Sequence, residues 1–174
     1  MSAPISIEPV ETDWGKAEFA HLYRNAAADN GVGVHGAAVN SLAPLEVEPP
    51  APSLNTLWSR HAQPTSRAWC LRRQRDIEAV AWFSKVADQA ELLDIRVARH
   101  ARGAGLGRQL LNYAQIQLAA EGVCECFLEV RASNQIAQRL YSRLGWVVSG
   151  RRSNYYTTCT GREDAILMAL HLHG

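Results

Sequence analysis

The stretch HARGAGLGRQ, at residues 100–109, places three glycines at alternate positions: Gly103, Gly105 and Gly107. Because glycine has no Cβ, a ligand can approach the backbone there closely. Free N–H groups of such a turn, together with the N-terminus of a following helix, form an anion site. Pyrophosphate is the natural occupant, and Arg102 and Arg108 flank the glycines and could add positive charge. A purely structural turn before a helix is the alternative interpretation.

Two other phosphate-binding motifs fit this stretch less well. It is not a P-loop, because no Gly-Lys-Ser/Thr follows the glycines. A dinucleotide-binding fingerprint needs its glycines after the first strand of a βαβ unit, with an acidic residue about 20 residues later. Glu121 and Glu125 could imitate that acid. This alternative therefore stays open.

The elements around the glycines predict an α/β fold. Strands at 67–74, 77–87 and 91–98 form a meander that leads into the loop. A helix at 105–120 follows, with apolar residues at four-residue steps. The apolar run at 123–130 suits a buried parallel strand, which makes strand, helix and strand a crossover unit. A helix at 134–144 and two closing strands, at 146–152 and 164–172, complete the prediction.

The first third of the chain is less regular. A helix is predicted at 13–29, and a short helix at 54–61 with Ser53 as its N-cap. Between them, residues 30–52 are rich in glycine and proline and indicate a long loop. We expect one domain, in which 67–174 form a regular core and 1–66 a variable region.

Several segments carry a family resemblance. Arg102-x-x-Gly105-x-Gly107 resembles the acyl-coenzyme A loop of the GNAT acetyltransferases. LEVRASN at 128–134, LYSRLGW at 140–146, NYY at 154–156 and GREDAILMAL at 161–170 are similar to the RimI branch of that family. The resemblance covers about residues 76–172. It implies a mixed sheet flanked by helices. It also implies transfer of acetyl from acetyl-CoA to the N-terminal amine of a protein, an alanine of a ribosomal protein in that branch.

The resemblance also implies which residues hold the coenzyme. The backbone of Ile95, Arg96 and Val97 matches the segment that pairs with the pantetheine arm, and Asn134 matches a coenzyme-contacting asparagine. The pyrophosphate loop corresponds to Arg102, Gly103, Ala104, Gly105, Leu106, Gly107 and Arg108.

Two more positions match the catalytic residues of the family: Glu129 the general base and Tyr141 the general acid. The chemistry suits these roles. An N-terminal ammonium, with a pKa of about 8, must lose a proton, and the leaving thiolate must gain one. Without the resemblance, Glu129 also fits a salt-bridged carboxylate, Tyr141 a core residue and Asn134 a helix cap. Tyr155 and Tyr156, in a predicted loop, are candidates for acceptor binding.

The acceptor side departs from the RimI pattern. That branch has a Phe-Pro-Trp-Ser run, where this chain has Leu57-Trp58-Ser59 without a preceding Phe-Pro. The alternatives are therefore acetylation of a lysine side chain or of a small-molecule amine, or a non-catalytic acyl-CoA-binding module.

Composition narrows the functional classes. The net charge of +1 gives no reason to expect a nucleic-acid partner, and no apolar run is long enough to span a membrane. Four cysteines without metal spacing predict reduced thiols and no metal site. We therefore expect a cytoplasmic protein.

Overall fold

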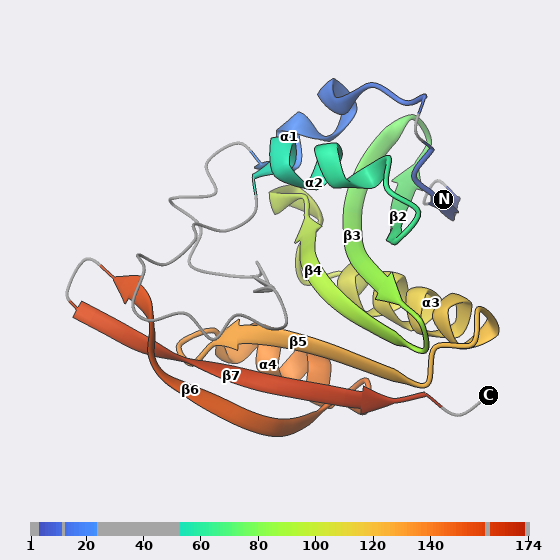
Figure 1. Ribbon diagram of the computed structural model, residues 1–174. Coiled ribbons are helices and arrows are strands. Elements are labelled where there is room, and N and C mark those ends of the chain that lie inside the picture. The colour runs from blue at the N-terminus through green and yellow to red at the C-terminus, as the bar shows by residue number, and fades with distance from the viewer. Residues whose placement is uncertain (1–3, 12, 24–52, 159–160, 173–174) are drawn as a thin grey trace.

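A mixed seven-stranded sheet with the strand order β1-β2-β3-β4-β5-β7-β6 forms the centre of the described structure (Figure 1). The computed structural model describes residues 4–11, 13–23, 53–158 and 161–172. The strands are β1 Ile5–Pro9, β2 Ser66–Arg73, β3 Asp76–Val86, β4 Gln89–Val97, β5 Glu125–Arg131, β6 Val147–Thr158 and β7 Gly161–His171. The helices are α1 Ala20–Tyr23, α2 Leu54–His61, α3 Leu106–Ala120 and α4 Gln135–Ser142, with 3-10 turns η1 Lys16–Phe19 and η3 Arg99–Ala101.

Neighbouring strands are antiparallel except β4 and β5, which are joined by the α3 crossover and run parallel. Their pairing covers only Gln89–Glu91 on β4 and Glu125–Phe127 on β5. A bulge in β4 opposite Trp82 and Phe83 adds Leu93, and β4 then turns away from β5. The two strands diverge toward their carboxyl ends (Figure 1). This divergence opens the sheet and, among the described residues, leaves the edge of β4 beyond Glu91 without a neighbouring strand.

Helices cover both faces of the sheet. On one face lie α3 and α4, and a Cβ added at Gly107 on α3 would lie 3.6 Å from Leu140 Cδ2 on α4. The opposite face carries η1, α1 and α2 (Figure 1). There Phe19 packs against Trp58 and Trp82, with ring centroids 5.5 and 6.0 Å away. The core therefore consists of two layers, and β3, which is buried along most of its length, separates them.

The regular part of the chain follows the sequence prediction closely. The three-strand meander, the α3 crossover and the Ser53 cap are confirmed, and Ser53 Oγ accepts a hydrogen bond from the Thr56 amide at 3.2 Å. The edge strand β1, which pairs with β2, was missed, because Pro4 and Pro9 bracket a segment of only four residues. The helix predicted at 13–29 begins at Lys16 and is described only to Tyr23. The predicted loop at 30–52 lies outside the described residues.

One prediction about β6 is wrong. Tyr155 and Tyr156 were expected in a loop, but β6 continues through them to Thr158. Its register with β7 shifts between Arg152 and Tyr156, and Asn154 has a φ of 53° there. Such an irregularity allows one strand to continue through the polar, loop-like sequence RRSN.

Candidate active site

The glycine loop forms one wall of a cavity of about 650 Å³ at the N-terminus of α3. Gly103 and Gly105 have φ values of 79° and 78°, which disfavour any residue with a Cβ. A Cβ at either position would meet no other atom within 4 Å. Neither glycine is therefore needed for close packing within the chain, and both leave the backbone open toward the cavity. The loop thus has the open backbone that the predicted phosphate cradle requires, and phosphate binding there stays a prediction.

Four arginines line this cavity: Arg102 from the loop, Arg108 from the first turn of α3, Arg139 from α4 and Arg143 from the C-cap of α4. The first two were predicted, whereas the other two were missed. Their spacing of four residues places them one helical turn apart, which is the signal that could have identified them. Guanidinium groups suit phosphate because they offer several N–H donors and a permanent charge. The cavity therefore fits a ligand with several phosphates.

The free edge of β4 leads away from this cavity. Val97 lines the cavity, whereas Ile95 and Arg96 do not. Ile95 points toward α3, where its Cδ1 atom would lie 3.9 Å from a Cβ at Gly107. The Arg96 side chain is on the opposite face, where its Nε donates to Asp94 Oδ2 at 3.1 Å. Any coenzyme contact of Ile95 and Arg96 therefore falls to their backbone groups, as predicted for a strand edge.

Glu129 lies on β5, two residues beyond its last pairing with β4. Only 5% of the residue is exposed. Its Oε1 atom accepts from Arg152 Nε at 3.0 Å, and its buried Oε2 atom has no partner among the described residues. Burial raises the pKa of this carboxyl, and the Arg152 charge and a hydrogen bond with Tyr155 lower it. One carboxylate oxygen is thus held in place, and the other is available for a ligand.

Tyr141 on α4 is fully buried, and its hydroxyl has no hydrogen-bond partner in the described part of the chain. Its ring meets Trp146 edge-on at 6.1 Å. Burial raises the pKa of this phenol well above 10, and the charges of Asp94 and Tyr156 raise it by smaller amounts. The phenol therefore keeps its proton at neutral pH. A buried donor without a partner is uncommon in folded proteins, which makes this hydroxyl a candidate for contact with a ligand.

Sequence reasoning missed a buried network that begins at Asp94. Asp94 Oδ2 accepts from Tyr23 at 2.8 Å as well as from Arg96, and Trp82 Nε1 donates to the Tyr23 hydroxyl at 2.9 Å. The other oxygen, Oδ1, is buried without a partner among the described residues. Burial raises the pKa of Asp94 to about 6, because desolvation outweighs the effect of Arg96. No sequence spacing links Tyr23 to Asp94, since only the fold brings α1 against β4.

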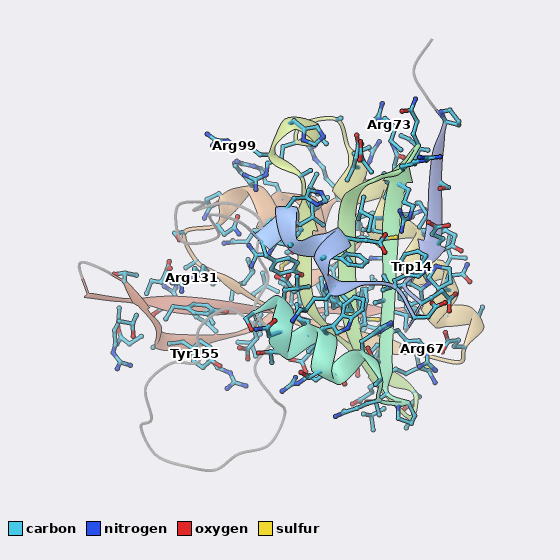
Figure 2. All side chains as sticks on the ribbon, turned by 90° about the horizontal axis from the view of Figure 1, so that it is seen from above. Trp14, Arg67, Arg73, Arg99, Arg131 and Tyr155 are labelled. Carbon is cyan, nitrogen blue, oxygen red and sulfur yellow. The ribbon has the colours of Figure 1, made fainter. Side chains whose placement is uncertain are left out.

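Other predicted residues have more ordinary contacts. Asn134 caps α4, accepting from the Ala137 amide at 3.1 Å, and it does not line the large cavity. Tyr156 is buried under the Arg131 guanidinium, which lies 4.2 Å from its ring centre. Tyr155 is half-buried, near Arg152 and Glu129. Tyr155 lies on the β6–β7 arm that extends away from the helices of the opposite face (Figure 2). Of the two tyrosines, only Tyr155 therefore lies beside a predicted catalytic residue.

A second cavity, of about 160 Å³, adjoins Glu129 and Arg152. It is smaller than a typical small-molecule pocket of roughly 300–1,000 Å³. Such a space suits the end of a chain better than a whole ligand. The candidate site thus offers an open glycine turn lined by arginines, a carboxylate with a free oxygen and a protonated phenol.

The model of the acetyltransferase (GNAT) family matches residues 38–146. The chain belongs to the GNAT acetyltransferase family. It is therefore an N-acetyltransferase, and enzymes of this family use acetyl-CoA as co-substrate. A relative from Escherichia coli K12, a ribosomal protein bS18-alanine N-acetyltransferase, is 44% identical over 100 residues, which cover 58% of this chain and 68% of the relative. The enzyme of that name from Salmonella typhimurium LT2 is 47% identical over 92 residues, covering 53% and 62%.

Solved structures agree with this assignment. The Escherichia coli ribosomal-protein-S18-alanine N-acetyltransferase superposes with a TM-score of 0.76 at 30% identity, covering 98% of this chain and 96% of that one. A chimera of Vibrio cholerae spermidine N-acetyltransferase SpeG and hSSAT reaches 0.71 at 19% identity, covering 97% and 95%, and shares the fold. The GNAT fold and the RimI resemblance predicted from sequence are thus confirmed.

No helix in the described ranges is long and apolar enough to cross a bilayer. Within the same ranges, no group of three or more histidine, cysteine or acidic side chains could hold a metal ion. Cys70, Cys124 and Cys126 are free thiols, of which Cys70 and Cys126 are buried and Cys124 is exposed, and Cys159 lies outside the described residues.

Proposed function

We propose that this enzyme transfers acetyl directly from acetyl-CoA to the N-terminal α-amine of a protein, with the alanine of ribosomal protein bS18 as the favoured acceptor. The observation that carries this proposal is a pair of buried atoms without partners among the described residues, Glu129 Oε2 and Tyr141 Oη. One can accept a proton and the other can donate one. The relatives described above, which are named for this acceptor, support its choice.

The residues fit acetyl-CoA. Gly103 and Gly105 offer backbone amides that no Cβ covers, and the arginines of the large cavity match the phosphates of the coenzyme. The unpaired edge of β4 offers amide and carbonyl groups to the pantetheine arm. Bound acetyl-CoA supplies a thioester, whose carbonyl carbon accepts the amine and whose sulfur leaves as a thiolate.

Glu129 is the proposed general base. Arg152 holds one of its oxygens, which orients the carboxylate, and the Arg152 charge offsets part of the rise in pKa that burial causes. The free Oε2 atom takes the proton from the acceptor ammonium, either directly or through one water. The neutral amine that results is a nucleophile, whereas the ammonium is not.

Tyr141 is the proposed general acid. Its raised pKa keeps the phenol protonated, and a hydroxyl without a partner can be directed at the departing sulfur. Asp94, whose charge contributes to that raised pKa, helps to hold the proton on Tyr141 until transfer. The reaction needs no covalent enzyme intermediate, because the acceptor amine itself attacks the thioester carbon.

In this proposal, two parts of a single domain bind the coenzyme and the acceptor. Residues 67–174 bind the coenzyme and carry both catalytic groups. Residues 1–66 contribute α1 and α2 to the face on which Glu129 lies, so they form part of the acceptor side. Tyr155, beside Glu129, is an acceptor contact, whereas the buried Tyr156 supports the strand.

Incubation with acetyl-CoA and a set of acceptors tests the proposal. The set contains peptides with N-terminal alanine, the same peptides with a blocked N-terminus and an internal lysine, and free polyamines. Mass spectrometry should find acetyl only on the α-amine. Acetylation of lysine or polyamine alone would contradict the proposed α-amine acceptor and identify a different one. Tight acetyl-CoA binding without any turnover would instead indicate a binding module.

A further inference from the structure

Glu91 on β4 is a second carboxylate in the small cavity that Glu129 lines. Its Cα atom pairs with that of Phe127, two residues before Glu129 on β5. Because alternate residues of a strand share a face, Phe127 and Glu129 project from the same side of the sheet. Glu91 projects from this side too. It is opposite Ser84 on β3, and Ser84 shares a face with Trp82, which packs under α2. The two carboxylates therefore enter one space from neighbouring strands.

The charges around this space do not balance. Arg152, from β6, is paired with Glu129 at 3.0 Å. The Glu91 side chain has no ion pair or hydrogen bond within the described residues. Arg60, from α2, and Arg152 act on it only through longer-range attraction. Ser84, Gln89 and Ser149, the other polar residues of the lining, are neutral. Two carboxylates and one lining guanidinium leave a net negative pocket, which is complementary to one cation.

We propose that Glu91 is a further acceptor-binding residue, which together with Glu129 holds the substrate as its ammonium and shares the proton that the ammonium loses. This inference rests on the proposed function, because Glu91 would give the proposed acceptor site its specificity for a cation. An N–H bond of the ammonium breaks, an O–H bond forms on a carboxylate, and the amine keeps the electron pair for attack.

The acidity of Glu91 supports this assignment. Burial and then the charge of Glu129 raise its pKa to about 7. An α-ammonium has a pKa of about 8, so a carboxyl group in this range exchanges a proton with it at little cost. Binding of a cation between the carboxylates also removes their mutual repulsion, which favours the charged acceptor over a neutral one.

The test compares wild-type enzyme with Glu91→Gln and Glu91→Asp, with Glu125→Gln as the matched control. Glu125 also lies on β5, but it pairs with His171 at 3.5 Å and does not line the cavity. Steady-state kinetics use acetyl-CoA and a peptide with N-terminal alanine, from about pH 6 to pH 9. We expect Glu91→Gln to raise the peptide KM about tenfold above pH 7, with the acetyl-CoA KM unchanged. Glu91→Asp should recover part of the loss, and Glu125→Gln should match wild type.

Calorimetry supplies a readout that needs no turnover. In the presence of CoA, wild-type enzyme should bind the free-amine peptide about tenfold more tightly than its N-acetylated form, and Glu91→Gln should lose this preference. If the preference is lost but wild type acetylates no α-amine, the proposed function fails and the cation site stands. If Glu91→Gln keeps both the wild-type KM and the wild-type preference, Glu91 has no role in acceptor binding. A melting temperature of the variant at or above that of wild type excludes misfolding as the cause of a loss.

Discussion

Arg152 Nε lies 3.0 Å from Glu129 Oε1, and the two residues come from strands separated by β7. The contact leaves the second carboxylate oxygen buried without a partner among the described residues. The nearer arginine in sequence, Arg131, instead pairs with Glu163 at 2.7 Å. Arg152 therefore holds the candidate base by one oxygen and leaves the other for substrate.

Replacement of Glu129 by glutamine should lower turnover most at low pH. The acceptor amine is then almost fully protonated and depends on the base, whereas at high pH it loses its proton unaided. General bases typically contribute roughly 10²–10⁴-fold, and we expect a loss in that range near pH 7. The pH profile of kcat/KM measures the effect, and the acetyl-CoA affinity should stay within about twofold of wild type. A uniform loss across the pH range would argue against a base.

Replacement of Tyr141 by phenylalanine should separate activity from stability. The hydroxyl has no partner among the described residues, so its removal leaves no donor or acceptor unsatisfied and should change the free energy of unfolding by less than about 1 kcal/mol. Turnover should fall about 10–1,000-fold if the phenol protonates the thiolate. Thermal unfolding and steady-state kinetics measure the two effects. Unchanged kinetics would assign proton donation to another group.

Gly105 and Gly122 allow a matched test of the phosphate cradle. Their φ values are 78° and 81°, and a Cβ at either would meet nothing within 4 Å. Substitution by alanine should therefore destabilise both variants similarly, by about 1–2 kcal/mol. Only Gly105→Ala places a methyl group at the large cavity, so only this variant should lose affinity for acetyl-CoA. Equal affinities in both variants, measured by calorimetry, would show that phosphate does not bind at Gly105.

Asp94 should be important for stability. Asp94→Ala leaves the Arg96 guanidinium, which is buried, without its carboxylate and deprives Tyr23 of its acceptor. Loss of one partner of a buried ion pair typically costs about 3–5 kcal/mol. Glu121→Gln, which breaks the largely exposed pair with Arg67, should cost less than about 1 kcal/mol. Urea denaturation compares the two variants, and equal midpoints would contradict the importance of the buried network.

Glu91 should make the stability of the fold pH-dependent. Its pKa rises from 4.5 to about 7 on folding, so the folded chain holds a proton that the unfolded chain has already lost in this window. Wild-type stability should therefore fall as the pH rises from about 4.5 to about 7. Glu91→Gln removes this pH-dependent loss of stability and should therefore melt at a higher temperature than wild type above pH 7. The expected shift is about 2–4 °C for each kcal/mol of added unfolding free energy. The two melting temperatures should converge near pH 4, and a constant difference at every pH would refute the shift.

The sequence by itself determined the elements whose signals are local. The glycines before α3, the apolar steps along that helix and the Ser53 cap each depend on neighbours within a few residues. The motifs around Gly105, Glu129 and Tyr141 likewise lie within single segments. This is why the family and its fold could be read from residue order. The limit of β6 could not, because a strand with a register shift has no simple alternation.

Only the tertiary structure decided which side chains meet across the sheet. Glu91 and Glu129 share a cavity because β4 and β5 pair for three residues before they diverge. Arg152 reaches Glu129 across β7, and Tyr23 reaches Asp94 from a helix 71 positions away. Burial follows from these contacts and shifts the acidity of each group, because desolvation depends on what surrounds a charge in space. The chain order therefore determined the chemical groups, and the fold determined their environments.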